Sequence, residues 1–396
     1  MQRWLTIKLT QKERCLILIG SFTVLVGILY WIQFSSNALP LPEPFVGDLP
    51  SARPPVDMEI FKIPTGVNHR SAAFAYRGGS ILDKRDFSMM AVLVKHPRGD
   101  LLIDTGFGRN IKSYFKTMPA YFRITTDFDP GRSAADQLND VGYDRRALKA
   151  ILITHAHWDH VSGIPDFPGT PILITDEEHK YIINGGWITS LMRNFQNVNY
   201  EEYRFESGPY LGFPKSHDVY GDGSIVVVPS PGHTPGSVSI FITLPTGKRF
   251  AMIGDLAWQR EGVLEREERP LIQRTLGDDR SDQVREGLLR MAAIARRFPE
   301  IIIVPAHDVR GFEFMPLLAK DRSHVGWARC CAHADSSFWN SHLCHVIAAQ
   351  RLQAQAISLR WSLTQGISGA VLAFKHPILN FAHGKTTQPG RLNQMN

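Results

Sequence analysis

The 396-residue sequence has only four cysteines, and none of them lies between residues 16 and 329. This long central stretch therefore has neither a cysteine nucleophile nor a cysteine metal ligand. Any metal site within it must be built from histidine and carboxylate side chains.

The centre of the chain also lacks an excess of charge of either sign. The net charge is +6, but residues 15–320 have 33 basic residues against 35 acidic ones. The excess lies instead in residues 1–14 and 321–396. A near-neutral domain lacks the basic footprint of a protein that binds nucleic acid, so we expect no nucleic-acid partner.

Residues 15–34 contain no charged side chain at all. Twenty residues at about 1.5 Å each can cross a hydrocarbon core of about 30 Å. A helix that is apolar on every face is rare in a soluble domain. We therefore predict a transmembrane helix, which would be the chain's contact with a membrane.

Charge asymmetry predicts the orientation of this helix. No Lys or Arg occurs in residues 35–52, whereas four precede the apolar segment: Arg3, Lys8, Lys12 and Arg14. Because positive flanks stay cytoplasmic, residues 1–14 should be cytoplasmic and the rest exocytoplasmic, periplasmic in a Gram-negative bacterium. Residues 36–38 could be a signal-peptide cleavage site, but the apolar run exceeds the usual length of about 7–15 residues. An uncleaved single-pass anchor is the favoured interpretation.

Two segments flank the expected catalytic domain of residues 58–320. Residues 35–57 contain six prolines and predict an extended linker that lifts the domain off the bilayer. Residues 321–396 lack glutamate, and Cys330, Cys331 and Cys344 lie there among irregularly spaced histidines. That spacing does not fit a regular metal knuckle, so we predict a poorly ordered extension, with a disulfide as an open alternative.

The richest motif is residues 154–163, T-H-A-H-W-D-H-V-S-G, which follows the apolar run of residues 148–154. It places His155, His157, Asp159 and His160 on the loop that leaves a predicted strand. Imidazole and carboxylate are the ligands that Zn²⁺ and related divalent ions prefer. The alternative is a surface turn that happens to hold three histidines.

Further histidine and aspartate residues follow three later apolar runs. His233 lies in P-G-H-T-P-G after residues 225–229, Asp255 follows residues 250–253, and His307 follows residues 301–305. Each is a weak signal alone, but together they complete a set. With Asp104 in L-L-I-D-T-G, the chain resembles the metallo-β-lactamase superfamily over roughly residues 58–318.

The resemblance implies a dinuclear centre with two divalent ions, of which Zn is the first choice, although Mn, Fe or Co would suit the same ligands. His155, His157 and His233 would hold one ion, and Asp159, His160 and His307 the other. Asp255 would bridge two ions that lie about 3.5–4 Å apart. Asp104 would orient a ligand histidine through its other ring nitrogen.

The resemblance also implies an αββα sandwich with the metals at one edge of two sheets. The sequence suggests strands at residues 89–96, 101–104, 150–154, 171–175, 225–229, 238–244, 250–253 and 301–304. It also predicts a helix over residues 282–298, with Ser281 as N-cap and an apolar face of Val284, Leu288, Met291 and Ala295.

Within the superfamily, the pattern is closest to N-acyl homoserine lactone lactonases and similar hydrolases. β-Lactamases lack the bridging aspartate, and residues 321–396 do not resemble the glutathione-binding part of glyoxalase II. Lactonases have a tyrosine three residues after that aspartate, where this chain has Trp258. An indole N–H donates one hydrogen bond but cannot exchange a proton, so Trp258 is a candidate substrate contact.

The sequence therefore predicts a membrane-anchored metal-dependent hydrolase of a small amphiphilic ester or lactone. A metal-bridging hydroxide would attack, and Asp255 and Asp159 would serve proton transfer to the leaving oxygen. Aromatic residues in segments 107–130 and 181–213 would form either the pocket walls or ordinary packing. The alternatives are phosphodiesterase, thioesterase or sulfatase activity of the same fold, or a non-catalytic membrane-tethered binding module.

Overall fold

The computed structural model describes residues 10–319 of the chain. The expected extension of residues 321–396, with Cys330, Cys331 and Cys344, lies outside the described residues, as do residues 1–9.

The chain begins with one long apolar helix, α1 (Gln11–Phe34). Thr10 caps it through a reciprocal exchange with Glu13, which satisfies two amides at the helix start. Its most apolar stretch has a mean hydropathy of 2.4, and none of that stretch is buried. By length and composition the helix could cross a membrane, although a signal sequence would have the same properties.

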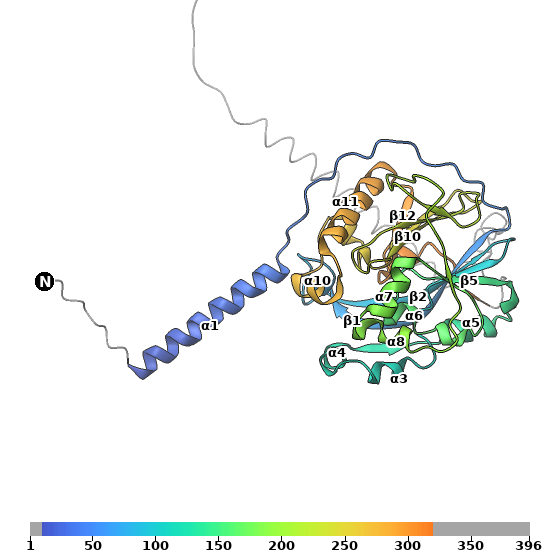
Figure 1. Ribbon diagram of the computed structural model, residues 1–396. Coiled ribbons are helices and arrows are strands. Elements are labelled where there is room, and N and C mark those ends of the chain that lie inside the picture. Colours follow the sequence, from blue (N-terminus) through green and yellow to red (C-terminus); the bar gives the residue numbers. More distant parts are fainter. Residues whose placement is uncertain (1–9, 320–396) are drawn as a thin grey trace, which may run out of the picture. The chain divides into compact units, whose positions relative to one another are not determined.

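Two sheets form the centre of the domain (Figure 1). The strands of the first, in spatial order, are β4 (Phe128–Pro130), β1 (Glu59–Ser71), β2 (Lys84–Lys95), β3 (Asp100–Ile103), β5 (Leu148–Leu152), β6 (Ile172–Ile174) and β7 (Tyr200–Glu202). Those of the second are β12 (Ile301–Val304), β11 (Arg249–Met252), β10 (Val238–Thr243), β9 (Ile225–Pro229) and β8 (His217–Asp218).

Alternation along the strands explains the layers. In β2, Val92 and Val94 belong to the core shared by both sheets, whereas Ala91 and Leu93 belong to a second core on the outer side. Successive side chains of a strand point to opposite faces, so an apolar run buries both. The αββα sandwich that the sequence predicted is confirmed.

Helices cover the outer faces. A core with residues of α5 (Ala134–Asp140), α6 (Trp158–Val161) and α7 (Asp176–Asn184) lies against the first sheet, and α11 (Ser281–Arg297) covers the second. The remaining helices are short: α2 (Ala72–Ala75), α3 (Ile111–Lys116), α4 (Ala120–Thr125), α8 (Ser190–Arg193), α9 (Glu261–Leu264), α10 (Leu271–Gly277) and α12 (Val309–Phe312).

Helix α11 differs from its prediction at the start. Ser281 is the first helical residue, Arg280 occupies the cap position, and no side chain caps the helix. The Arg280 amide donates to the carbonyl of Gly232 at 2.8 Å. That bond holds the chain before the helix, so the prediction that Ser281 is the N-cap is wrong.

Residues 35–57 form neither helix nor strand, but they do not stand away from the domain. Leu39 is buried, and its backbone exchanges hydrogen bonds with Arg266. Further along, the Phe45 ring packs on Phe298 with centroids 5.6 Å apart, and the Arg53 amide donates to the Asp222 carbonyl. The segment lacks helix and strand, in keeping with the extended linker that its prolines predicted, but it follows the domain surface.

Candidate metal centre

Strand ends bring the candidate ligands to one edge of the sandwich. His155 and His157 follow β5, and α6 contributes Asp159 and His160. The other three follow β9, β11 and β12: His233, Asp255 and His307.

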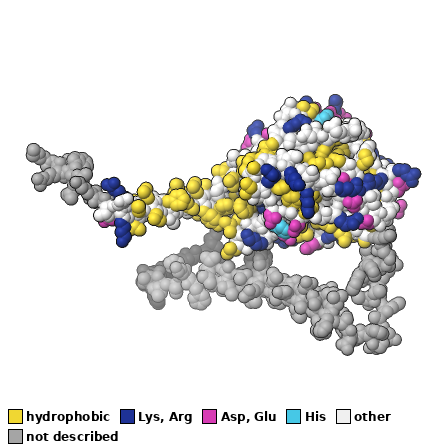
Figure 2. All heavy atoms as spheres, turned by 90° about the horizontal axis from the view of Figure 1, so that it is seen from below, with side chains coloured by type: hydrophobic (Ala, Val, Ile, Leu, Met, Phe, Trp, Pro, Cys, Tyr) yellow, Lys and Arg dark blue, Asp and Glu magenta, His cyan; other side chains and the backbone are white. Residues whose placement is uncertain are grey.

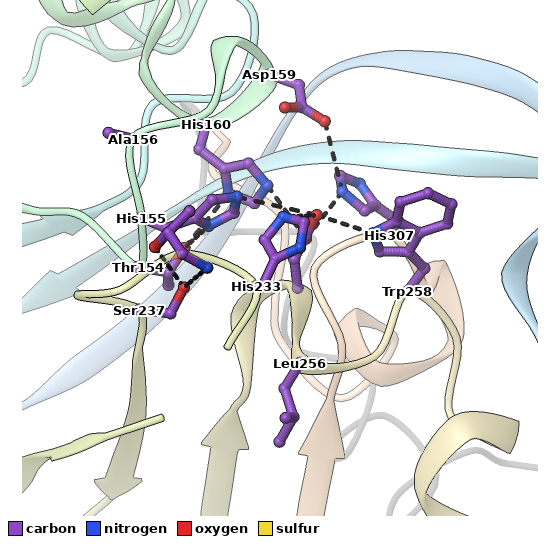
Figure 3. A network of polar contacts seen from close by, with 12 residues as sticks. Thr154, His155, Ala156, Asp159, His160, His233, Ser237, Leu256, Trp258 and His307 are labelled. Atoms are coloured by element: carbon purple, nitrogen blue, oxygen red, sulfur yellow. Dashed lines mark hydrogen bonds and ion pairs between the residues drawn. The ribbon is translucent and has the colours of Figure 1, made fainter. Parts of the chain in front are cut away.

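The seven side chains converge. Their ligand atoms form three groups, in each of which all atoms lie within 4.8 Å of one another: His155, His157 and His233; His155, His160 and Asp255; Asp159, His160 and His307. Figure 3 shows the rings of His155, His160, His233 and His307 turned toward a common centre, with Asp159 beside His307.

Asp255 lies in the middle of this arrangement. Its Oδ2 lies 3.2 Å from His233 Nε2 and 3.9 Å from His155 Nε2. Its Oδ1 lies 3.0 Å from His307 Nε2 and 3.3 Å from His160 Nε2. One carboxylate oxygen thus faces each half of the centre, which is the arrangement that a bridging ligand requires.

The donor atoms are buried and lack hydrogen-bond partners. This holds for Nε2 of His155, His157, His160 and His233 and for Oδ1 of Asp255. Unpaired buried polar atoms are costly, and a native structure rarely keeps a cluster of them without an unseen ion or water. The centre therefore has the ligand types and the unfilled bonding capacity that divalent metal ions would satisfy.

Electrostatics point the same way. Burial lowers the pKa of His155 and His157 well below the ordinary value, so both imidazoles are neutral and present lone pairs. Burial also lowers the pKa of His160, but the carboxylates of Asp104 and Asp255 outweigh it and raise that pKa well above its usual range. The surroundings of His160 thus favour positive charge, which a metal cation would supply.

The other ring nitrogens are held by partners outside the centre. His160 Nδ1 lies 2.9 Å from Asp104 Oδ2, His233 Nδ1 lies 2.9 Å from Asp278 Oδ1, and His307 Nδ1 donates to the Ser88 carbonyl at 3.0 Å. Such contacts fix the tautomer and direct each Nε2 inward. Asp104 was predicted from the sequence, whereas Asp278 and Ser88 were not.

Asp104 adopts an unusual backbone conformation to reach this position, with φ of +52°. Its carboxylate accepts hydrogen bonds from the Thr154 amide at 2.7 Å and the Thr154 hydroxyl at 2.8 Å. These bonds tie the end of β3 to the loop that carries His155 and offset the cost of a left-handed non-glycine residue.

Glu178 on α7 is a second missed residue. It is fully buried and accepts hydrogen bonds from the amides of Ala156 and Gly236 and from the Thr234 hydroxyl. Ala156 lies between two candidate ligands and Thr234 beside a third, so Glu178 holds two ligand loops together. In the sequence, Glu178 is only an acidic residue in the first turn of a helix that Thr175 caps. That pattern is common at exposed helix starts, so it did not indicate a buried role.

Trp258 lies at the rim of the centre and donates from Nε1 to Asp255 Oδ2 at 2.9 Å (Figure 3). The guanidinium of Arg269 lies over its ring, 5.1 Å from the centroid. Arg269 also donates to the Asp255 carbonyl and to the Asp278 carboxylate. One buried arginine therefore joins Trp258, Asp255 and the residue that holds His233.

The aromatic residues of segment 107–130 form a packed cluster. Phe107, Phe115, Phe122 and Phe128 pack around Trp158, each with a centroid within 6 Å of the Trp158 ring. From segment 181–213, Trp187 packs on Phe122 with centroids 5.1 Å apart. Trp158 is buried and precedes Asp159 in the sequence, so this cluster is packing beside the candidate ligands, and the role of these residues as pocket walls stays a prediction.

Comparison with known proteins agrees with this geometry. The chain is 26% identical over 173 residues to the N-acyl homoserine lactonase AttM of Rhizobium radiobacter, which covers 42% of this chain and 64% of the lactonase. A probable metallo-hydrolase of Mycobacterium tuberculosis is 28% identical over 245 residues, 55% of this chain and 73% of that protein. This chain thus spans less than two thirds of the length of that lactonase.

Solved structures show the same fold. An N-acyl homoserine lactone hydrolase with N-hexanoyl-L-homoserine bound at its catalytic metal centre superposes with a TM-score of 0.52 at 17% identity, over 65% of this chain and 96% of that one. The sequence profile of the metallo-beta-lactamase superfamily matches residues 86–307, which include every candidate ligand. This chain belongs to the metallo-beta-lactamase superfamily and resembles its lactonase-like branch.

Proposed function

We propose that the chain is a membrane-anchored hydrolase that uses two divalent metal ions, with zinc as the first choice, to cleave an ester-type bond in a lactone or similar small amphiphile. The observation that carries the proposal is the convergence of seven ligand side chains, five of which have an inward donor atom that is buried and unpaired. A binding module would not need a carboxylate shared between two halves of such a centre.

When bound, two such ions supply an activated water and polarise the substrate oxygen. The chain's own residues then set the geometry. Asp255 would hold the two halves in register, and Asp104 and Asp278 would keep the imidazoles of His160 and His233 turned inward. Asp159, whose side chain is the more exposed carboxylate of the centre, would pass a proton to the departing oxygen.

Trp258 occupies the position at which lactonases have a tyrosine that can exchange a proton. Its N–H already donates to Asp255, so its contribution would be to orient that carboxylate and to offer an apolar ring edge to the substrate. This supports a lactonase-like hydrolase whose preferred substrate differs from N-acyl homoserine lactones, the substrates named for its relatives.

A second candidate is hydrolysis of a phosphodiester or sulfate ester, and Arg70 favours it. Its guanidinium donates to Thr126 Oγ1 at 3.1 Å, and Asp159 attracts it electrostatically. Burial lowers the pKa of Arg70, although an arginine retains its charge. A fixed cation on the Asp159 side of the centre would suit an anionic substrate.

The test is a substrate screen on the full chain in lipid nanodiscs, with lactones, thioesters, phosphodiesters and sulfate esters side by side. We expect about two transition-metal ions per chain, hydrolysis of the ester-type substrates, and loss of most turnover in Asp255→Ala. Asp140→Ala, at an exposed carboxylate paired with Arg132, is the matched control. Full activity after metal removal, or in Asp255→Ala, would refute the proposal.

A further inference from the structure

Helix α1 runs directly into the catalytic domain. The Phe34 carbonyl accepts from the Gly78 amide at 2.7 Å, and the Ser35 carbonyl accepts from Arg77 Nε at 3.0 Å. The Asn37 amide donates to Glu267 Oε2 at 3.0 Å. The domain is therefore fastened at the very end of the apolar helix.

Helix α10 lies at this junction. Gln33, in the last turn of α1, accepts at Oε1 from the Ile272 amide at 3.0 Å. No residue of α10 is buried, and three of its seven residues are exposed large apolar side chains: Leu271, Ile272 and Leu276. Exposing three large apolar side chains of one short helix to water is unfavourable. The exposed face of α10 therefore suggests contact with an apolar partner.

Other exposed apolar side chains lie on segments fastened to the same junction. We define the apolar rim as the three residues of α10 together with Leu264, Ile81, Leu82, Tyr121 and Ile124. The loop of Ile81 and Leu82 closes on α2 through the Asp83 carbonyl, and Arg77, just before it, binds the Glu268 carbonyl. Figure 2 shows hydrophobic side chains both along α1 and on the part of the domain where α1 ends.

Tyr121 and Ile124 belong to α4, which is bonded to the end of β1 that adjoins α2. Arg70, one residue before the end of β1, donates to the carbonyl of Thr125 at the end of α4. The rim thus has two helical parts, α10 and α4, both labelled in Figure 1.

The charge around α4 suits a lipid headgroup layer. Residues 105–126 contain no Asp or Glu, and they carry four basic residues: Arg109, Lys112, Lys116 and Arg123. Basic side chains beside exposed apolar ones are typical of surfaces that lie in a membrane interface.

Both parts of the rim adjoin the metal centre. A Cβ added at Gly277, the last residue of α10, would lie 4.0 Å from His233 Cε1. On the other side, Phe122 of α4 packs on Trp158 with centroids 5.8 Å apart, and Trp158 precedes Asp159. The candidate centre therefore lies between the two apolar helices.

We propose that the apolar rim lies in the lipid interface and that the centre takes its substrate from the bilayer, as an amphiphile with an acyl chain in the lipid and a hydrolysable ester-type head. This rests on the membrane anchoring and the ester hydrolysis in the proposed function. Tyr30 and Trp31, near the end of α1, would lie at the same depth, where aromatic side chains are favoured.

The test measures depth without any need for catalysis. Full-length chain with the four native cysteines replaced by serine is reconstituted in vesicles of phosphatidylethanolamine and phosphatidylglycerol. A nitroxide is attached in turn at Ile272→Cys, Ile124→Cys, Leu25→Cys and Leu317→Cys, and accessibility to oxygen is compared with accessibility to a water-soluble nickel complex. Leu317 is the matched control for Ile272, because the two side chains are about equally exposed but Leu317 lies beside Lys62. Lys62 is nine residues from Ser71, the last residue of β1 before α2, which corresponds to about 30 Å along the strand. Leu317 therefore lies far from the apolar rim.

We expect the labels at residues 272, 124 and 25 to favour oxygen and the label at residue 317 to favour nickel. If residue 25 favours oxygen but residues 272 and 124 match residue 317, the rim proposal is overturned while the anchor stands. If residue 25 also favours nickel, the anchor in the proposed function fails, and the rim proposal with it.

A kinetic measurement tests the substrate class separately. In the same vesicles, the combined variant Ile272→Asp and Leu276→Asp should lower kcat/KM for a long-chain ester relative to a short-chain ester about tenfold, because two carboxylates on α10 would disfavour its contact with the lipid. Leu317→Asp should leave that ratio unchanged. An unchanged ratio in the rim variant would refute delivery of substrate from the bilayer.

Discussion

At the scale of single residues, the centre depends on groups that contact the histidine rings on the side away from the candidate metal position. Each of three inward histidines is held from behind by an oxygen of a distant segment: Asp104, Asp278 or Ser88. The geometry that would bind metal is thus distributed over the fold and not confined to the T-H-A-H-W-D-H motif.

Asp278 provides the sharpest test of this positioning. In Asp278→Asn, an amide would replace the oxygen that binds His233 Nδ1 and Arg269. We expect metal affinity to fall about 10–100-fold, the usual effect of losing such a partner, while activity recovers at saturating metal. Competition with a metal chelator measures the affinity. Asp282→Asn, at an exposed residue paired with Arg280, should change nothing, and an equal effect there would argue against a positioning role.

Glu261 makes a prediction about pH. Burial raises the pKa of this carboxyl, but Arg310 at 2.7 Å and Arg85 at 2.9 Å outweigh burial and lower it to about 2 from an ordinary value near 4.5. A lowered pKa stabilises the folded state above about pH 4.5, and this contribution is lost as pH falls toward 2.

Glu261→Gln should therefore lower the free energy of unfolding at pH 7 by about 1–2 kcal/mol, allowing for solvent at the two partly exposed arginines that pair with it. The difference from the natural chain should shrink between pH 4.5 and pH 2. Denaturant titrations at several pH values measure it, with Glu286→Gln on the exposed face of α11 as control. A difference that stays constant with pH would show that the effect is not the carboxylate charge.

At the scale of elements, the sequence predicted what is local. The candidate ligands follow short apolar runs, and each of those runs is a strand: β5, β9, β11 and β12. Period-two burial and the strand-end position of polar residues are properties of neighbouring residues, so they could be read without the fold.

Features that depend on tertiary contacts could not be predicted from the sequence. Strand β1 is the longest strand described, yet Pro64 and Gly66 interrupt its pattern, and it depends on pairing with β2 around a bulge. Likewise, the prolines of residues 39–55 indicated an extended chain but not that Leu39 and Phe45 would pack on the domain.

Helix α11 allows a prediction about packing. Leu288 is fully buried against the second sheet, in the core that also contains Met291 and Val284. Leu288→Ala should lower the free energy of unfolding by about 2–5 kcal/mol, because it removes apolar contacts and leaves a cavity. Glu286→Ala, two residues earlier on the exposed face, should cost less than about 0.5 kcal/mol. Equal costs in urea titrations would contradict this assignment of the helix faces.

At the scale of the whole molecule, the junction between α1 and the domain limits how the protein can lie on a membrane. The bonds from Gln33 to Asn37 leave no free tether, so an anchored helix would hold one face of the domain at the bilayer. This links the proposed anchor to the supply of substrate, since the same face carries the apolar rim.

The orientation of the chain across the membrane is the last prediction, and it depends chiefly on charge. Four basic residues precede the apolar helix, whereas none occurs in the 18 positions 35–52, so the amino terminus should stay in the cytoplasm and the metal domain should face outward. A domain without cysteine between residues 16 and 329 suits an oxidising compartment. Alkaline phosphatase fused after Lys320 should be active and a cytoplasmic reporter fused there should not, while high salt should leave the protein in the membrane fraction. The reverse reporter pattern, or a soluble mature chain that begins near Leu39, would contradict the outward-facing anchor.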